Sequence, residues 1–274
     1  LVFSRESEEK FFGGGKVNNY VYRQLYASLQ HQIMMAGLPY DLIYVDQLKD
    51  LKTIVNYNAL VFSYSAYLND SDREKVVENL RLAVHYYGIG LISGDNFLTD
   101  PAGVNPTPLA EPYRAMWEIL GVSINGYGSG NLTIAASNAN HPVMSGYANG
   151  EVLLTYPGGF YNHYGAVSLP GIFQTSSTVT VLAQTVTGEH AHNSLLAVET
   201  LSGARHVHFS TVTTMADGNL VWQALRWVVY GAATPVGLQM SRQKSVFSAR
   251  NDVDLAMFPD KVQDTVKPLL TNHM

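Results

Sequence analysis

Short apolar runs alternate with helical patterns over residues 1–120, and this alternation constrains the fold more than any other feature of the chain. Strands are expected at 1–3, 40–45, 59–62 and 89–92. Helices are expected between and after them, at 20–36, 51–55, 72–87 and 112–120. The alternation predicts a mostly parallel sheet that helices cover on both faces.

The second half of the chain is richer in strands. Strand patterns at 132–136, 152–156, 179–184, 194–200 and 205–210 precede one last helix at 219–230. We therefore predict one α/β domain of flavodoxin-like type over residues 1–234, with a β-rich extension of its sheet. A linker at 235–244 then leads to a separate segment at 245–274.

The composition narrows the range of partners. With a net charge of −5 and 17 Lys and Arg in no clear cluster, the chain is not expected to bind nucleic acid. The abundant Asn, Ser, Thr, Gly and 17 Tyr suit neutral polar ligands such as sugars, although an exported protein with a weakly charged surface has the same composition. The absence of Cys excludes disulfides and a Cys nucleophile. No apolar run reaches the ~18 residues of a membrane span.

Three segments resemble a known superfamily. They are residues 59–62 leading into the helix 73–87, the run 90–94, and the pair 140–144 and 205–209 followed by 224–227. Their order resembles the class I glutamine-amidotransferase-like superfamily, including its trehalose-utilisation-like branch. The resemblance covers most of residues 1–231 and implies a strand-to-helix elbow at 90–94.

The elbow departs from the catalytic members of that superfamily, which carry a Cys activated by a His–Glu pair. The corresponding residue here is Ser93, and no matching His–Glu pair is evident. The turn after Ser93 also lacks the second Gly of a G-x-S-x-G elbow. We expect a turn that does no chemistry; the alternative is a hydrolase in which a neighbouring base activates Ser93. His206 and His208 alternate along a strand and are interpreted as structural.

The segment 245–274 carries a different pattern. A strand-like run at 245–249 delivers Asp252 and Asp254 ahead of a helix-like stretch at 260–270, which is typical of the first βα unit of a (β/α) barrel. This resembles the first motif of NodB-like polysaccharide deacetylases. The resemblance implies that Asp252 and Asp254 are catalytic, one as general base and one as ligand of a divalent metal, with zinc the expected ion. Asp254 is our candidate ligand, with the assignment between the two left open.

The combination of the two parts resembles the fungal galactosaminogalactan deacetylase family and its bacterial relatives. That resemblance implies a secreted, cell-surface or periplasmic protein whose residues 1–234 bind an amino-sugar exopolysaccharide and need no cofactor. The metal-binding His residues would lie beyond Met274, so we expect this chain to be inactive as a deacetylase. A domain that merely positions the barrel is the remaining alternative.

Candidate ligand-binding residues follow from the position of ligands in open α/β sheets, beyond the carboxyl ends of the strands. Tyr64 and Tyr67 follow the third strand, and Asp95 and Asn96 follow the fourth, where they can bind sugar hydroxyls or simply form turns. The run 156–164 is expected to be an irregular loop. Its aromatic residues can stack on sugar rings or pack over the β-rich region; they are Tyr156, Phe160, Tyr161 and Tyr164.

Overall fold

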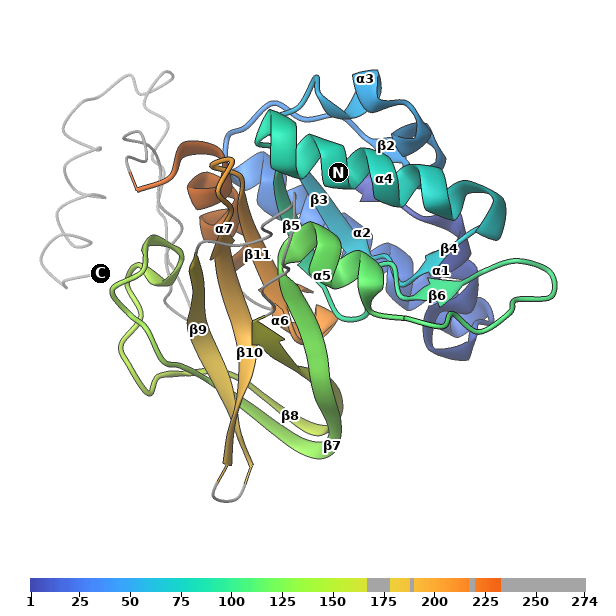
Figure 1. Ribbon diagram of the computed structural model, residues 1–274. Coiled ribbons are helices and arrows are strands. Elements are labelled where there is room, and N and C mark those ends of the chain that lie inside the picture. The colour runs from blue at the N-terminus through green and yellow to red at the C-terminus, as the bar shows by residue number, and fades with distance from the viewer. Residues whose placement is uncertain (167–177, 188–189, 217–219, 233–274) are drawn as a thin grey trace, which may run out of the picture. The chain divides into compact units, whose positions relative to one another are not determined.

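The computed structural model describes residues 1–166, 178–187, 190–216 and 220–232, and of 158–166, 178, 186–187 and 190–191 it describes the backbone only. The chain divides into two units, Leu1–Leu238 and Gln239–Met274, and every described residue belongs to the first. The expected linker and the segment with Asp252 and Asp254 therefore lie outside the described residues. Figure 1 shows the first unit.

Five parallel strands form one half of a nine-stranded sheet and confirm the predicted α/β architecture. Their spatial order is β2-β1-β3-β5-β11, the flavodoxin-like arrangement. The strands are β1 (Val2–Phe3), β2 (Ile43–Tyr44), β3 (Ala59–Tyr64), β5 (Gly90–Gly94) and β11 (Arg205–Phe209). All five are short, and β3, β5 and β11 are almost wholly buried because helices cover both faces of the sheet.

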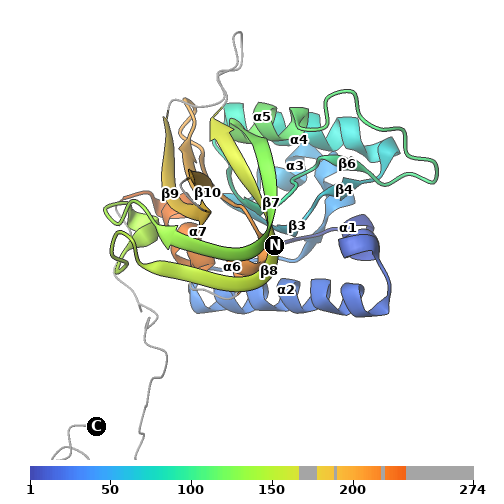
Figure 2. The same cartoon turned by 90° about the horizontal axis from the view of Figure 1, so that it is seen from below.

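The helices lie in two layers, one on each face of the sheet (Figure 2). One layer packs over a core that contains Leu29, Val61 and Leu225. It consists of α2 (Lys16–Met35), α6 (Val212–Ala216) and α7 (Leu220–Tyr230). The other layer packs over a core that contains Phe62 and Leu80. It consists of α3 (Leu51–Ile54), α4 (Asp70–Tyr87) and α5 (Arg114–Leu120).

Four antiparallel strands extend the sheet beyond β11 in the order β10-β9-β7-β8, which matches the predicted β-rich extension. They are β7 (Val122–Ala136), β8 (Val152–Ala166), β9 (Thr178–Thr187) and β10 (His190–Glu199). The sequence patterns predicted only the final third of β7 and the first third of β8. The expected irregular loop at 156–164 is wrong, because these residues are part of β8 and pair with β7.

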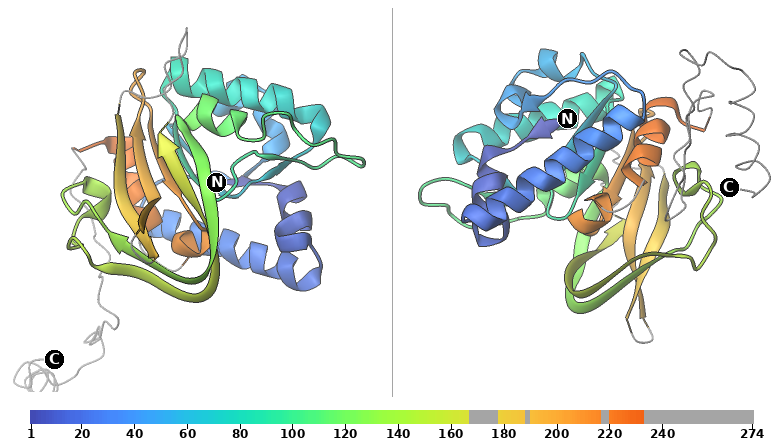
Figure 3. Two further views of the ribbon diagram at one scale, coloured as in Figure 1. Left: turned by 60° about the horizontal axis from the view of Figure 1, so that its bottom comes forward. Right: turned by 180° about the vertical axis from the view of Figure 1, so that it is seen from behind.

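The β7–β8 hairpin is a long curved ribbon on the side of the sheet where the parallel strands end (Figure 3). Val122, at its start, belongs to the core beneath α4 and α5. Leu132 and Ile134, near the end of β7, belong to the opposite core. The ribbon therefore joins the two helical layers around the carboxyl edge of the sheet.

The sequence patterns predicted no helix or strand between residues 3 and 20, but this stretch is largely helical. It contains α1 (Arg5–Lys10) and a single 3-10 turn, η1 (Phe11–Gly13), ahead of α2. Helix α1 has no apolar periodicity; the side chain of Ser4 caps it by accepting from the backbone N–H of Ser7 at 3.1 Å. The remaining short elements are η2 (Val45–Lys49), β4 (Tyr67–Leu68), β6 (Asp100–Pro101) and η3 (Pro142–Met144).

Candidate functional site

The crevice that open α/β sheets commonly use for ligands is filled here by the chain itself. The strand order reverses direction between β1 and β3, and ligands bind at such a switch point. The hydroxyl of Tyr22, a fully buried residue of α2, accepts from the backbone N–H of Ser4 and from the Ser63 hydroxyl, each at 3.2 Å. Burial raises the pKa of Tyr22 to about 12, so the phenol stays neutral while it occupies the space between β1 and β3.

Three polar residues lie abreast where the central parallel strands end. Tyr64 and Phe209 are both in register with Gly94, so the residues that follow them, Ser65, Asp95 and Ser210, reach the same level of the edge. All three are at most 3% exposed. The hydroxyl oxygens of Ser65 and Ser210 have no hydrogen-bond partner among the described residues. This edge is polar but closed to solvent.

The elbow of the chain is at Asp95, not at Ser93 as the sequence analysis expected. Asp95 has a φ of 55°, a left-handed conformation that is uncommon for a residue other than glycine. Its backbone N–H donates to Phe209 at 2.8 Å, and its carboxylate accepts from the N–H of Asn96 at 2.9 Å. Ser93 lies two residues earlier, within β5, and is fully buried.

Ser93 has an imidazole partner, although the sequence shows no matching His–Glu pair. Its Oγ lies 2.9 Å from Nδ1 of His208, the residue beside it in the register of β5 and β11. Burial lowers the pKa of His208 to about 3, and a hydrogen bond with the backbone of Asp95 opposes that shift only in part. A general base works best with a pKa near the working pH. Both residues are completely buried, so the contact joins β5 to β11 in a place that solvent does not reach.

Aromatic rings cover the end of β3. Phe12 stacks on Tyr64, with ring centroids 6.2 Å apart, and Phe11 packs edge-on against the same ring at 4.9 Å. Tyr64 is consequently only 7% exposed, and burial is the main cause of its raised pKa. Tyr67 is half-buried, and the Lys10 ammonium lies 5.3 Å from its ring centroid. Of the four predicted residues at this edge, Tyr64 and Asp95 are buried, while Tyr67 and Asn96 are partly exposed.

The other four predicted residues lie together on β8, at the far end of the sheet from β5. Tyr156 is opposite Leu132 of β7 and is 47% exposed. Phe160, Tyr161 and Tyr164 occupy register positions opposite Ser129, Gly128 and Ile124, respectively. The structure thus separates the eight predicted residues into two groups, one at the closed edge and one on the ribbon.

The ribbon has a property that the sequence analysis missed. Neither β7 nor β8 contains an Asp, Glu, Lys or Arg, so its thirty residues carry no formal charge. Tyr127, which the sequence analysis did not single out, is 70% exposed and pairs with Asn162. Asn125 and Asn131 are exposed on the same strand. The signal that could have found this surface is the charge-free composition of the two segments read together.

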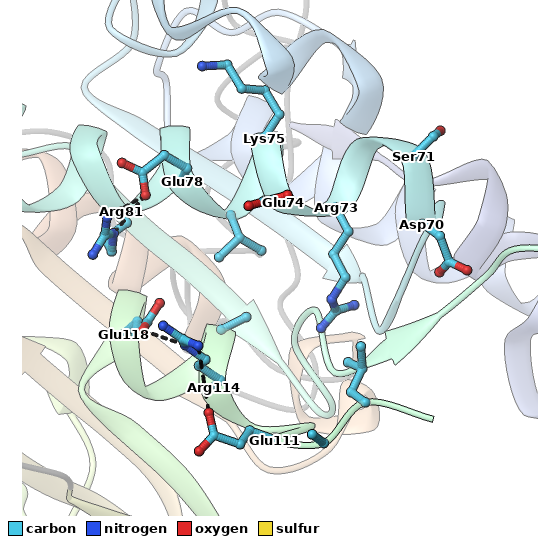
Figure 4. Close-up of a pocket in the computed structure, with 14 residues that line it drawn as sticks. Asp70, Ser71, Arg73, Glu74, Lys75, Glu78, Arg81, Glu111, Arg114 and Glu118 are labelled. Carbon is cyan, nitrogen blue, oxygen red and sulfur yellow. Dashed lines mark hydrogen bonds and ion pairs between the residues drawn. The ribbon is translucent and has the colours of Figure 1, made fainter. Parts of the chain in front are cut away.

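A groove of about 940 Å³ lies between α4 and α5 (Figure 4). Charged side chains of both signs line it, and several are already paired. Arg81 binds Glu78, and the Arg114 Nε donates to Glu118 at 2.7 Å. Arg73 donates to the backbone carbonyls of Leu98 and Asp100 and so holds the loop after β5 against α4. Arg81 and Arg114 are therefore already engaged within the protein, and the lining of the groove carries both signs of charge.

No group of three His, Asp or Glu side chains that could hold a metal ion occurs within residues 1–166, 178–187, 190–216 and 220–232. None of the helices in the same ranges is both long and apolar enough to cross a bilayer.

Two solved structures have a fold similar to that of this chain. The chain is similar to a ThuA-like protein from Bacteroides uniformis, with 12% identity and a TM-score of 0.51 over 77% of this chain and 86% of that one. It is also similar to a ThuA-like protein from Parabacteroides merdae, with 13% identity and a TM-score of 0.50 over 79% and 88%. No protein-family model and no curated protein matches the sequence.

These two similarities concern the fold alone, because both identities are low. ThuA-like proteins have a glutamine-amidotransferase-like fold, so that part of the sequence resemblance is confirmed. The likeness to a deacetylase fusion has no counterpart among the comparisons.

Proposed function

We propose that residues 1–234 form a non-catalytic carbohydrate-binding domain, and that the β7–β8 ribbon is its binding surface. The observation that carries the proposal is the charge-free ribbon with Tyr127 and Tyr156 exposed on it. Sugars present C–H faces that stack on aromatic rings, and hydroxyls that pair with amides and backbone groups. A curved strand pair of fifteen residues a side suits a polymer better than a single sugar.

The closed edge of the sheet favours binding over catalysis. Ser93 and His208 are inaccessible, and Tyr22 fills the switch point, so neither position admits a substrate in this structure. The ribbon, in contrast, offers exposed side chains on a long paired hairpin. Affinity per site is expected to be weak, with Kd between about 0.1 and 1 mM, because an exposed platform desolvates only one face of the ligand.

An amino-sugar exopolysaccharide remains the proposed ligand, and a metal-dependent deacetylase the proposed parent. This finer proposal rests on the sequence pattern of residues 245–274, with Asp252 and Asp254. A reading frame that continues past Met274 into a barrel with a His pair on a later helix would support it. A frame that ends at once or continues without such a pair would count against the deacetylase parent but not against sugar binding.

Calorimetric titration tests the binding surface. We expect heat with an N-acetylated amino-sugar hexamer and less heat with its deacetylated, cationic counterpart, because the ribbon holds no carboxylate to pair with an ammonium. Tyr127→Ala and Tyr156→Ala should each weaken binding by about 2- to 10-fold, the loss expected for one aromatic contact.

Tyr87→Ala is the matched control, since Tyr87 is 57% exposed but lies on α4, away from the ribbon. Its affinity should equal that of the unchanged protein. No heat with any hexamer, or equal losses in all three variants, would contradict the proposal.

A hydrolase that uses Ser93 is the rival function, and the 2.9 Å contact with His208 is the observation in its favour. It predicts that a fluorophosphonate probe labels the folded protein and that Ser93→Ala abolishes the label. We expect no labelling of the folded protein, because the hydroxyl is fully buried.

A further inference from the structure

Helix α2 has one buried face and one exposed face, and its orientation is fixed. Tyr22, Leu25, Leu29 and Ile33 face the core. Gln32 Nε2 donates to the carbonyl of Met215 at 2.7 Å, and the indole of Trp222 donates to the carbonyl of Met35 at 3.1 Å. These bonds tie the helix to α6 and α7, so its other face points outward. Figure 3 shows α2 as an outer helix in the view from behind.

The outward face carries large apolar side chains that a surface helix normally buries. Val17 is 76% exposed, Tyr20 62% and Met34 59%. Val21 and Met35 lie beside these residues at the two ends of the helix, and each is 47% exposed. Between the ends lie Gln24, Ala27 and His31, all exposed. We call the six residues that run along its centre the α2 stripe: Val17, Tyr20, Gln24, Ala27, His31 and Met34.

The spacing of the α2 stripe is that of a coiled-coil seam. Its members follow one another at intervals of three and four residues, which keeps them in line along a helix that pairs with another helix. The intervals are also symmetric about the midpoint between Gln24 and Ala27. An antiparallel copy of α2 therefore brings each member opposite another member: Val17 opposite Met34, Tyr20 opposite His31, and Gln24 opposite Ala27.

We propose that the α2 stripe binds a second copy of this chain, through an antiparallel pair of α2 helices about a two-fold axis. A two-fold contact requires a surface that is complementary to itself. In such a pair the apolar Val17 of one copy meets Met34 of the other, and the Tyr20 ring meets the His31 imidazole. The small Ala27 at the centre lets the helices approach closely.

Charge is consistent with this choice of partner. The stripe contains no Asp, Glu, Lys or Arg, and α2 as a whole has no acidic residue. Arg23, at the margin of the stripe, binds Glu8 of its own chain. A helix pair of this length buries less than the ~800 Å² per partner of a typical stable complex, so we expect weak, concentration-dependent dimers.

Sedimentation of the Cys-free chain tests the self-association. We expect the weight-average mass to rise from one chain toward two between about 1 µM and 1 mM, the range of weak interfaces. Ala27→Glu should weaken the dimer at least 10-fold by placing two carboxylates near the axis. Val104→Glu is the control, because Val104 is 99% exposed and lies outside α2, and it should dimerise like the unchanged protein. A single-chain mass at 1 mM overturns the proposal.

Single cysteines test the antiparallel register, since the natural chain has none to confuse the result. Positions 17 and 34 of one helix are ~26 Å apart, far beyond disulfide reach. Val17→Cys mixed with Met34→Cys should therefore cross-link on oxidation, whereas neither variant should cross-link with itself. Self-linked Val17→Cys would indicate a parallel pair and overturn the proposed geometry. Cross-linking is independent of sugar binding, so its failure leaves the proposed function unaffected.

Discussion

At the scale of single residues, burial decides what Ser93 and His208 do. A hydroxyl 2.9 Å from an imidazole is the geometry of an activated nucleophile, yet both groups are fully buried between strands. His206 lies two residues earlier on the same strand, and its Nδ1 accepts from the backbone N–H of Leu91 at 3.1 Å. Burial lowers the pKa of both imidazoles to about 3, so both are neutral at physiological pH.

This neutrality predicts acid sensitivity. Each folded-state pKa of about 3 lies below the ordinary histidine pKa of 6.5, so between these values the unfolded chain binds more protons than the folded one. The stabilisation is complete above pH 6.5 and is lost as the pH falls toward 3. Each histidine should contribute a slope of about 1.4 kcal/mol per pH unit to the free energy of unfolding. Urea titrations at pH 7, 6 and 5 measure that slope.

His208→Gln is the informative variant for this prediction, because an amide does not titrate. Its unfolding free energy should depend on pH less steeply than that of the unchanged protein over the same interval, even if it is less stable throughout. Equal slopes in the two proteins would show that His208 is not the source of the acid sensitivity.

At the scale of elements, the turn between α1 and α2 depends on backbone conformations that few residues adopt. Phe12 has a φ of 44°, and the three glycines after it all have positive φ. A Cβ on Gly14 would lie 2.5 Å from the carbonyl oxygen of Glu9, whereas a Cβ on Gly13 would have no neighbour within 4 Å. The turn is what places Phe12 over Tyr64.

Gly14→Ala and Gly13→Ala therefore form a matched pair. Both should lose about 1 kcal/mol, because alanine is strained at positive φ. Gly14→Ala should lose at least ~1 kcal/mol more, because its methyl group would overlap the backbone of α1. Chemical denaturation of the two variants measures the difference. Equal losses would mean that the turn adjusts without cost.

The elements also show what the sequence could and could not predict. The parallel strands and the long helices were predictable, because buried runs and 3.6-residue periodicity reveal themselves locally. Helix α1 was missed because it is stabilised by capping at Ser4 and by end charges rather than by an apolar face. Most of β7 and β8 was missed because glycines and exposed polar residues interrupt their alternation. In the site, the contact of Ser93 with His208 depends on strand order, which no local pattern encodes.

At the scale of the whole molecule, one sheet serves two cores. The side chains of β3, β5 and β11 alternate between them, as when Val61 enters one core and Phe62 the other. If one helical layer detached, it would expose one face of the same strands whose other face forms the second core. Loss of one core would therefore destabilise the other. The described part of the chain should behave as one cooperative unit.

The three tryptophans provide reporters for each core. Trp117 lies on α5, and Trp222 and Trp227 lie on α7, on opposite faces of the sheet. Trp117→Phe leaves fluorescence from one layer only, and the double variant Trp222→Phe and Trp227→Phe leaves it from the other. In each variant the fluorescence midpoint should coincide with the far-ultraviolet circular dichroism midpoint. A separation of the two midpoints in either variant would indicate layers that unfold independently.

The complete enclosure of position 93 keeps the side chain there away from solvent in this structure. A thiol placed at Ser93 would be enclosed by the sheet and its helices in the same way. In a protein with no other sulfhydryl, a chromogenic reagent could reach it only during transient opening. The rate at which the colour develops would then report how often this edge of the sheet opens. Any chemistry at this edge would first require the same opening.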